Sequence, residues 1–500
     1  MSIFSDSERR FLTAVARLGY SNPFLKERIE LERTALGKQF VAGEAVWSAS
    51  VADPESAHVN VGRIQARLDP MIEGVRQRLD AAAAAGPADL AIYEECVHQL
   101  IYYRFNARME AADGNWRFYR EFAADWRHFL EIPGVHFETA LDPHHVFACF
   151  RQLVRAFRHI FYSIIGNSMP AARLRAAVWQ SVFTHDMRRY RRTMYARMRD
   201  FPTLITGPSG TGKELVARAI AGSRYVPFDP KRMEFADPAK EFFFPVNLAA
   251  LSPTLIESEL FGHRRGAFTG AIEDRKGWLE ACPPTGTVFL DELGEMDLSI
   301  QVKLLRVLET RRFSAVGDTA PREFSGKLIA ATNRDLPVEI RAGRFREDLY
   351  YRLCADQIHT PSLHDQVLDS PELLDDLLVY MVRRSVGEEA ERVIPEVREW
   401  VRNNLPADYA WPGNYRELEQ CVRNIVIHGS YHRLESGEAA GEDAFFGQFQ
   451  RGELTAEDVL AHYAAVVYRQ AGSYEEAARR LGLDRRTVKA KVGAFLQRSL

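Results

Sequence analysis

The segment Thr203-Leu-Ile-Thr-Gly-Pro-Ser-Gly-Thr-Gly-Lys-Glu214 decides the fold class of this chain. Its first four residues favour a strand and lead into a glycine-rich loop, which the helical run Glu214–Ala221 follows. A phosphate-binding loop requires this order of strand, loop and helix. Glycines let the backbone wrap so that successive N–H groups and the helix N-terminus point at phosphate oxygens, and Lys213 adds a positive charge. The segment predicts a nucleotide site; a glycine-rich turn that binds nothing is the alternative.

The residues expected to bind the nucleotide are those of the loop and the start of its helix: Gly207, Pro208, Ser209, Gly210, Thr211, Gly212, Lys213 and Glu214. Glu214 stands where a Ser or Thr usually ligates magnesium. The metal must therefore depend on groups elsewhere in the chain.

Two adjacent carboxylates at the end of an apolar strand, Gly286–Leu290, can supply those groups. At this edge of a parallel sheet Asp291 can hold Mg²⁺, and Glu292 can orient and polarise an attacking water. An Asp-Glu pair after a strand is, taken alone, most often a solvated loop or a helix cap. In the same sheet as a phosphate loop, the pair predicts hydrolysis of the bound nucleotide.

Hydrophobic patterning divides the chain into parts with different expected secondary structure. The first ~190 residues are mainly helical, with apolar residues at intervals of three and four. From Pro202 short strands such as Val288–Leu290 and Lys327–Ala330 alternate with helices, which predicts a parallel α/β sheet. After Asp365 only helices are expected up to Ile427.

Length and composition limit the class of protein. The 500 residues are enough for about three domains, and the net charge of −3 gives no global field for a polyanion. The five cysteines include no CxxC pair, so neither a disulfide framework nor a zinc site is expected, and a reducing cytosol fits best. No signal-peptide core and no run of about 18 apolar residues occurs, so we expect a cytoplasmic protein without a membrane span.

A distinctive segment lies between the phosphate loop and the acidic pair: Gly262-His-Arg-Arg-Gly-Ala-Phe-Thr-Gly-Ala271. It resembles the signature of bacterial enhancer-binding proteins, the AAA+ activators of sigma-54 RNA polymerase. The resemblance extends through the middle of the chain, from Thr203 to Glu417. It implies ATP and Mg²⁺ as cofactors, a hexameric ring of identical subunits, sigma-54 RNA polymerase as partner and enhancer DNA as the binding site.

The loop within that segment is small and flanked by glycines, and it carries one aromatic residue, Phe268, that we expect to be exposed. Such a loop can be raised on a hairpin or helix tip and can present an apolar plug with the hydroxyl of Thr269. From the residues alone it would be an ordinary surface turn. The resemblance implies that the loop grips the sigma factor, and the contact residues would be Gly266, Ala267, Phe268, Thr269, Gly270 and Ala271.

Two asparagines acquire roles by the same resemblance. Asn333 ends the strand Lys327–Thr332, where it would sense the γ-phosphate; a simple strand-end cap is the alternative. Asn247 matches the family asparagine that restrains the hydrolytic Glu292.

Three arginines complete the expected catalytic set. Arg346 and Arg352 match the arginines that reach into the neighbouring subunit's nucleotide site, although surface ion pairing is the ordinary role of an arginine. Arg416, in Trp411-Pro-Gly-Asn-Tyr-Arg-Glu417, matches the residue that couples the lid to the bound phosphate, with Asn414 and Glu417 read as a capping box.

Two segments depart from the family pattern. The spacing from Lys213 to Asn247 is longer than usual, and we interpret the surplus, about 229–241, as a surface insertion that leaves the nucleotide site intact. An arginine-rich stretch is replaced by Thr360-Pro-Ser-Leu-His-Asp-Gln366, which puts the usual connection from sheet to lid in doubt.

The C-terminal segment predicts a small helical domain. Capping residues Thr455, Ser473 and Asp484 begin three helices, and Gly482 ends the second of them. The last two helices resemble the Fis-type helix-turn-helix, and residues 472–500 carry a net charge of +4. The expected DNA contacts are Arg485, Arg486, Thr487 and Lys489; a hairpin that serves only packing is the alternative.

The N-terminal segment matches no family that we can name, and its position suggests a sensory or regulatory domain. Trp116, Tyr119, Trp126 and Phe129 recur at helical intervals and form either core or a ligand pocket, with core favoured. The adjacent His144-His145 is favoured as a solvated or cap-like pair over a metal site.

We therefore expect a multidomain chain: a helical N-terminal domain (1–180), an α/β P-loop AAA+ subdomain (181–360), a helical lid (361–430), a linker (431–452) and an all-α helix-turn-helix domain (453–500). The expected function is an ATPase that activates transcription by remodelling sigma-54 RNA polymerase. A AAA+ ATPase that remodels another protein or nucleic acid is the alternative. A nucleotide-regulated repressor without hydrolysis is a third class, against which Asp291 and Glu292 argue.

Overall fold

The computed structural model describes residues 3–42, 59–81, 85–137, 141–236, 242–432 and 454–498, together with Phe449 and Gly452. The chain divides into two compact units, Met1–Ser430 and Tyr431–Leu500. Most of the expected linker lies outside the described residues. No helix among these residues has both the length and the apolarity to cross a membrane. All five cysteines are free thiols.

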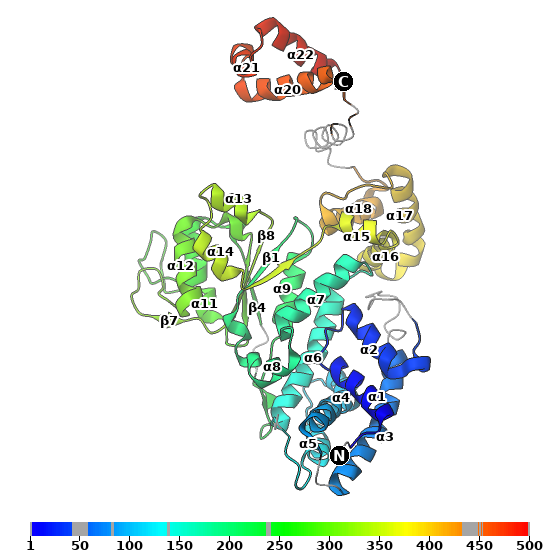
Figure 1. The fold of residues 1–500 in the computed structure, drawn as a ribbon. Helices are drawn as coiled ribbons and strands as arrows, with labels where there is room; N and C mark the ends of the chain where they lie inside the picture. Colours follow the sequence, from blue (N-terminus) through cyan, green and yellow to red (C-terminus); the bar gives the residue numbers. More distant parts are fainter. Residues whose placement is uncertain are drawn as a thin grey trace. The chain divides into compact units, whose positions relative to one another are not determined.

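A parallel sheet of five strands organises the first unit, in the order β4-β5-β8-β1-β9 (Figure 1). The strands are β1 (Thr203–Thr206), β4 (Phe243–Asn247), β5 (Thr287–Asp291), β8 (Lys327–Thr332) and β9 (Asp356–His359). Every neighbouring pair is parallel, which confirms the α/β prediction. Since parallel strands end at the same edge, the loops after β1, β4, β5 and β8 meet there.

Helices cover both faces of this sheet, as a buried parallel sheet requires. Neighbouring residues of β1 point to opposite faces. Leu204 joins the core beneath α12 (Leu298–Thr310) and α14 (Glu347–Leu353). Ile205 joins the core beneath α7 (Met169–Phe183) and α9 (Lys213–Gly222). Figure 1 shows α9 and α12 on opposite sides of the sheet. The helices of this layer are α9 (Lys213–Gly222), α10 (Pro253–Phe261), α11 (Trp278–Ala281), α12 (Leu298–Thr310), α13 (Leu336–Arg341) and α14 (Glu347–Leu353).

Two short antiparallel ribbons lie outside the sheet. One joins β2 (Phe228–Asp229) to β3 (Glu234–Phe235), and the other joins β6 (Arg312–Phe313) to β7 (Arg322–Glu323).

Four α-helices, which we call the lid, follow β9, in agreement with the return to helix expected there. They are α15 (Leu363–Asp369), α16 (Leu373–Val386), α17 (Ala390–Asn404) and α18 (Asn414–His428). The unusual connection at Thr360 is firmly bonded: its side chain is buried, donates to the Thr206 carbonyl at 3.1 Å and lies 2.7 Å from the Thr211 hydroxyl. The altered sequence therefore ties the lid connection to the phosphate loop.

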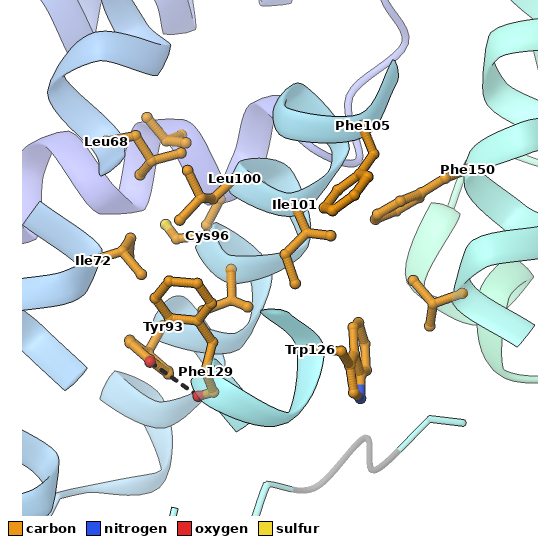
Figure 2. Close-up of a cluster of buried hydrophobic side chains, with 14 of the residues drawn as sticks. Leu68, Ile72, Tyr93, Cys96, Leu100, Ile101, Phe105, Trp126, Phe129 and Phe150 are labelled. Atoms are coloured by element: carbon orange, nitrogen blue, oxygen red, sulfur yellow. Dashed lines mark hydrogen bonds between the residues drawn. The ribbon is translucent and has the colours of Figure 1, made fainter. Parts of the chain in front are cut away.

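The α-helices that the structure describes before the sheet are α1 (Asp6–Leu18), α2 (Lys26–Leu36), α3 (Val59–Ala81), α4 (Pro87–Ala111), α5 (Tyr119–Leu130), α6 (Pro143–Ser163), α7 (Met169–Phe183) and α8 (Met187–Arg192). Helices α1 to α5 and the first half of α6 share one hydrophobic core, which we call the N-terminal layer. Figure 2 shows part of it, with the Tyr93 hydroxyl donating to the Phe129 carbonyl at 3.0 Å. The aromatic residues Trp116, Tyr119, Trp126 and Phe129 are buried there, as core rather than as a pocket lining.

The expected boundary between residues 180 and 181 falls inside α7. This helix packs on the sheet: Val178 and Phe183 share a buried cluster with Ile205 of β1 and Ile358 of β9. The second half of α6 joins the same cluster through Ala156 and Ile160. A single helix, α6, therefore belongs to two cores.

Residues 229–236, the described part of the predicted surface insertion, are exposed or half-buried, as predicted, but together with Phe228 they also pack against the N-terminal layer. Phe228 is 4% exposed and belongs to the core of the N-terminal layer, and its ring centroid lies 4.8 Å from that of Tyr119. Phe235 packs edge-on against Trp116, also at 4.8 Å. The hairpin β2–β3 therefore packs on the N-terminal layer through its aromatic residues, Phe228 and Phe235. Residues 237–241 lie outside the described residues.

The second unit contains α20 (Ala456–Ala471), α21 (Tyr474–Leu481) and α22 (Arg485–Arg498). Thr455 and Asp458 form the expected capping box, Ser473 accepts from the Glu476 amide, and Asp484 accepts from the amides at the start of α22. Ala477, Val488 and Val492 are buried between the helices.

Buried histidines in the first unit predict a loss of stability in acid. The ring of His159 on α6 lies against Gly222, and burial, with the nearby Arg155 and Arg158, lowers its pKa to about 4. Between its ordinary pKa and about 4, the unfolded chain therefore binds more protons than the folded chain, and stability falls as pH falls. We expect the melting temperature to drop between pH 7.5 and 5, and to drop less in His159→Gln. Equal drops in both proteins would contradict this origin.

Candidate functional site

The phosphate loop has the backbone form that its glycines predict. Gly207, Gly210 and Gly212 all have positive φ, at 141°, 76° and 87°, and Gly212 is the N-cap of α9. The Lys213 ammonium donates to the carbonyls of Gly207 and Pro208, at 3.0 Å each. The lysine thus lies folded over its own loop, where it can exchange these carbonyls for phosphate oxygens.

The charged groups of the site fit a nucleotide with a divalent cation. Burial lowers the pKa of Lys213 and raises the pKa of Asp291, so each is shifted toward its neutral form. An anionic phosphate beside the lysine and a cation beside the carboxylate would reverse both shifts. The donor set therefore suits phosphate at Lys213 and Mg²⁺ at Asp291.

The acidic pair lies at the expected edge of the sheet. Asp291 ends β5, and its Oδ1 accepts from the Glu292 amide at 3.0 Å. Glu292 adopts the left-handed conformation, with φ 55° and ψ 48°, which turns the chain sharply as it leaves the strand. Non-glycine residues rarely adopt this conformation, and such strain is concentrated at functional sites.

The two asparagines lie at the ends of the strands on either side of β5. Asn247 is opposite Asp291 in the register of β4 with β5, and its Oδ1 accepts from the Ala249 amide at 3.0 Å. Asn333 follows the last residue of β8 and is exposed at the same edge. The structure thus brings both to the edge that carries the acidic pair, with the Asn247 amide group bonded to its own turn.

The lid closes on the phosphate loop through residues at the start of α18. The Asn414 Nδ2 donates to the Ser209 carbonyl at 2.9 Å, and the Tyr415 amide donates to the Gly210 carbonyl at 3.1 Å. Arg416 donates to the Ser209 hydroxyl at 3.3 Å. Arg416 therefore reaches the loop from the first turn of α18, as expected.

The expected capping box of Asn414 and Glu417 is wrong. Gly413 is the N-cap of α18, and Glu417 accepts from the Gly413 amide at 2.7 Å. Asn414 is 3% exposed with φ 52°, and its Oδ1 accepts from the Leu363 amide at 2.8 Å. Its side chain bonds the phosphate loop and α15 at once, so it cannot cap its own helix.

Replacing Gly210 by alanine is expected to weaken nucleotide binding about tenfold. A Cβ at this position would lie 2.2 Å from the Gly413 carbonyl oxygen, so the lid would have to separate from the loop. The affinity can be measured by titration with a fluorescent ADP analogue. Gly343→Ala is the matched control, because Gly343 also has positive φ, at 70°, but has nothing within 4 Å. Equal affinity in the two variants would contradict the role of lid closure.

The remaining charged candidates make contacts within the subunit. Arg346 is exposed and pairs with Asp348 at 2.7 Å, and Arg352 donates to the Leu308 carbonyl at 2.9 Å. Glu214 pairs with Arg218 at 2.8 Å, on the exposed surface of α9. The structure does not bring Arg346 or Arg352 to this subunit's own phosphate loop through any contact among the described residues.

The loop Gly266–Ala271 stands on a short bridged stem. His263 and Arg275 exchange backbone hydrogen bonds of 2.9 Å, and the Gly266 amide donates to the Ala271 carbonyl at 2.8 Å. Thr269 is exposed, but the expectation of an exposed Phe268 is wrong: its ring is half-buried, edge-on to His263 at 5.0 Å.

The loop between β6 and β7 supports this stem from one side. Arg264 pairs with Asp318 at 3.0 Å, and a Cβ on Gly317 would lie 2.9 Å from that of Ala267. Hydrogen bonds hold the pKa of Asp318 down to about 2, so the carboxylate stays ionised. The two loops therefore form one structural element.

A scan against protein-family models matches residues 182–359 to one model, the "Sigma-54 interaction domain". Residues 182–359 are thus similar to sigma-54 interaction domains. The chain is 43% identical over 225 residues to the Nif-specific regulatory protein of Azotobacter vinelandii, covering 45% of this chain and 39% of that protein. It is 39% identical over 294 residues to the transcriptional regulatory protein ZraR of Escherichia coli, covering 58% of this chain and 62% of that protein. It thus spans about half the length of the curated relatives that it matches.

A solved structure of NtrX from Brucella abortus in complex with ADP aligns over 80% of this chain and 86% of that chain, with 22% identity and a TM-score of 0.42.

Sequence reasoning missed two residues, Thr360 directly after the matched residues 182–359 and Ile272 within them. Thr360 bonds both β1 and the phosphate loop, and a Cβ on Gly207 would lie 2.2 Å from its hydroxyl. Ile272, directly after the loop, is 83% exposed. An apolar residue beside a glycine-rich loop is a signal that could have identified the second of these; Thr360 gives none.

Proposed function

We propose that this chain is an ATP-driven transcription activator that remodels sigma-54 RNA polymerase. The observation that carries the proposal is the match of residues 182–359 to the sigma-54 interaction domain. These residues hold both the loop Gly266–Ala271 on its hydrogen-bonded stem and the sheet whose edge carries the phosphate loop. A remodelling ATPase with another target would have no reason to carry this loop.

The nucleotide proposed for the site is ATP. Lys213 and the amides at the start of α9 would bind the β- and γ-phosphates, and Arg416 would contact them from the lid. Glu292 would orient the attacking water and accept its proton, while Asn333 would sense the γ-phosphate. Asn247 would restrain Glu292 until the partner is engaged.

Mg²⁺ is proposed to bind at Asp291, whose pKa is raised by burial. The ion would supply charge neutralisation on the phosphates. Glu214 would leave the coordination to Asp291, because its carboxylate pairs with Arg218.

We infer that the active form is a ring of identical subunits, with a hexamer as the expected number. Arg346, the N-cap of α14, and Arg352, on the helix itself, are exposed and can exchange their intrasubunit partners for the phosphates of a neighbour. A guanidinium delivered in trans would stabilise charge on the transferring phosphoryl group. Each site would then be complete only in the ring.

The three helices of the second unit are proposed to be a Fis-type helix-turn-helix that binds enhancer DNA. Arg485, Arg486 and Lys489 are exposed at the start of α22, next to the half-buried Thr487. The basic side chains would contact DNA from the helix that enters the major groove. With polymerase and DNA as partners, the chain would act in the cytoplasm.

Deleting residues 453–500 is expected to lower affinity for the DNA site by about 100-fold or more. The probe is a fragment that the full-length chain has selected from a random pool, and the measurement is a fluorescence anisotropy titration. Lys276→Ala, which removes one exposed basic residue of the first unit, serves as control. Unchanged affinity after the deletion would contradict the assignment of DNA binding to this unit.

The function itself is tested with purified sigma-54 polymerase on a promoter template. We expect transcripts when the chain and ATP are both present, and none with a non-hydrolysable ATP analogue. Equal transcription with the analogue, or with a polymerase that carries another sigma factor, would contradict the proposal.

A further inference from the structure

Helix α9 joins the phosphate loop to the N-terminal layer. It begins at Lys213 and ends at Gly222, and the chain that leaves it enters the hairpin β2–β3 within six residues. The Arg224 guanidinium donates to the Pro284 carbonyl before β5 at 2.9 Å, which fixes the chain where it turns away from the sheet. A displacement of the phosphate loop, at the N-terminal end of α9, can therefore be passed along the helix to the hairpin, because only a short segment of chain separates the two.

Helix α6 contacts the other end of α9 closely. The Gln152 Nε2 donates to the Ser223 carbonyl at 2.8 Å, and both side chains are buried. A Cβ on Gly222 would lie 2.5 Å from the His159 ring, so the two helices are too close for a larger residue than glycine at this position. Because such an interface has no room to slide, α6 and the end of α9 must move together.

A histidine bridge adds a second connection. The ring of His145 lies between Tyr225 and α8: its Nε2 is 2.7 Å from the Arg191 carbonyl and its Nδ1 is 2.8 Å from the Tyr225 hydroxyl. A carbonyl can only accept, so Nε2 carries the proton and Nδ1 accepts from the tyrosine. Burial lowers the pKa of His145, which favours this neutral form.

A buried ion pair fixes α8 to the N-terminal layer. Glu95 on α4 lies 2.5 Å from Arg191 and 3.1 Å from Arg188. Burial alone would raise the pKa of Glu95, but Arg191 beside it holds that pKa well below its ordinary value. The pair is therefore charged, and separating it would leave a buried charge without its partner.

The hairpin completes the core of the N-terminal layer. The Phe228 ring lies 4.8 Å from Tyr119 and 4.8 Å from Phe147. The Phe235 ring lies under the Arg151 guanidinium at 3.9 Å. The ATPase sequence thus supplies side chains that the N-terminal layer needs to exclude water from its own interior.

We propose that the N-terminal layer regulates the nucleotide site through α9, with the hairpin Phe228–Phe235 as the mechanical connection, so that nucleotide binding and the packing of the N-terminal layer stabilise each other. The proposal rests on the proposed function as an ATPase. Ordering of the phosphate loop fixes α9, and a fixed α9 presents the hairpin in the position that the N-terminal layer binds. By linkage, a signal that loosens the layer weakens nucleotide binding by the same factor.

Hydrogen exchange of the full chain, with and without ADP and a non-hydrolysable ATP analogue, tests this coupling. In the wild type we expect nucleotide to slow exchange in residues 203–222 and also in α5, which lies far from the loop in sequence and touches the hairpin. Protection of 203–222 with unchanged exchange in α5 would overturn the coupling. No protection of 203–222 would instead remove the proposed function on which the coupling rests.

Variants separate the hairpin from the rest of the protein. Phe235→Ala removes a half-buried ring, and Tyr225→Phe removes only the hydroxyl that donates to His145 Nδ1. The second variant should therefore fold even where the first does not. In each we expect 203–222 to stay protected and the nucleotide-dependent protection of α5 to fall by more than about half. If nucleotide protects α5 in both variants as strongly as in the wild type, the proposal is overturned.

Phe40→Ala is the matched control, because Phe40 is also half-buried against the N-terminal layer but its ring faces Arg33 at 5.2 Å. We expect Phe235→Ala to weaken ADP affinity about fivefold and Phe40→Ala to leave it unchanged. Equal affinity in Phe235→Ala and the wild type would contradict the reciprocal effect.

Discussion

Replacing Glu292 by glutamine is expected to leave ATP bound while slowing its hydrolysis by roughly 100- to 10,000-fold, the usual contribution of a general base. Glutamine has the size of glutamate and tolerates the same backbone, so the turn at φ 55° should persist. Its amide cannot take a proton from water. Lys213 and Arg416 keep the contacts that hold the phosphate loop and the lid. The measurement is single-turnover hydrolysis beside a binding titration with ATP.

Glu295→Gln is the control for that experiment. Glu295 ends the 3₁₀ turn Leu293–Glu295 directly after Glu292, and it pairs with Arg334. The same chemical change is therefore made three residues away, and normal turnover is expected. Normal turnover in Glu292→Gln itself would exclude Glu292 as the base.

Replacing Thr269 by alanine is expected to lower promoter activation by about tenfold or more, while ATP hydrolysis is largely retained. Thr269 is exposed at the tip of the loop Gly266–Ala271, and the hydrogen bonds of the stem are made by backbone atoms that alanine keeps. Truncation of a central contact residue costs most where the partner packs around it. The readouts are transcripts from a sigma-54 promoter and phosphate release from the same reaction.

Thr254→Ala is the matched control, because Thr254 is also exposed, on α10 of the same domain. It should reduce neither readout. Activation that survives Thr269→Ala would exclude the loop as the contact with sigma-54, and a parallel loss of hydrolysis would show that the loop acts on the nucleotide site instead.

The catalytic edge could be predicted from sequence because its chemistry is carried by contiguous motifs. The strand before Gly207 and the strand before Asp291 are each strongly apolar, and in a parallel sheet their carboxyl ends must lie at one edge. Asn247 and Asp291 are register partners on the neighbouring strands β4 and β5, so their side chains do lie at this common edge.

Contacts between distant segments could not be predicted in the same way. Asn414 looks like a cap because its neighbours have a capping spacing, but its side chain bonds Ser209, which is 205 residues away. The exposure of Phe268 depends on His263, which lies across the stem of its own loop. In both cases tertiary contacts outweigh the local pattern.

The hairpin is the clearest case of this limit. Its aromatic residues lie among the charged residues Asp229, Lys231, Arg232 and Glu234, so residues 229–241 read as an exposed loop. Phe228 and Phe235 are register partners across the hairpin, and both face the N-terminal layer. Only the position of that layer, which no local pattern contains, shows what the rings contact.

The most direct test of the central claim is to measure promoter opening and ATP hydrolysis in one reaction that contains sigma-54 polymerase, the full chain and a promoter with its DNA site. Opening should require hydrolysable ATP in the wild type and should fail in Thr269→Ala at nearly normal ATP turnover. Opening that proceeds without hydrolysis, or that persists in Thr269→Ala, would contradict an activator that drives sigma-54 through this loop.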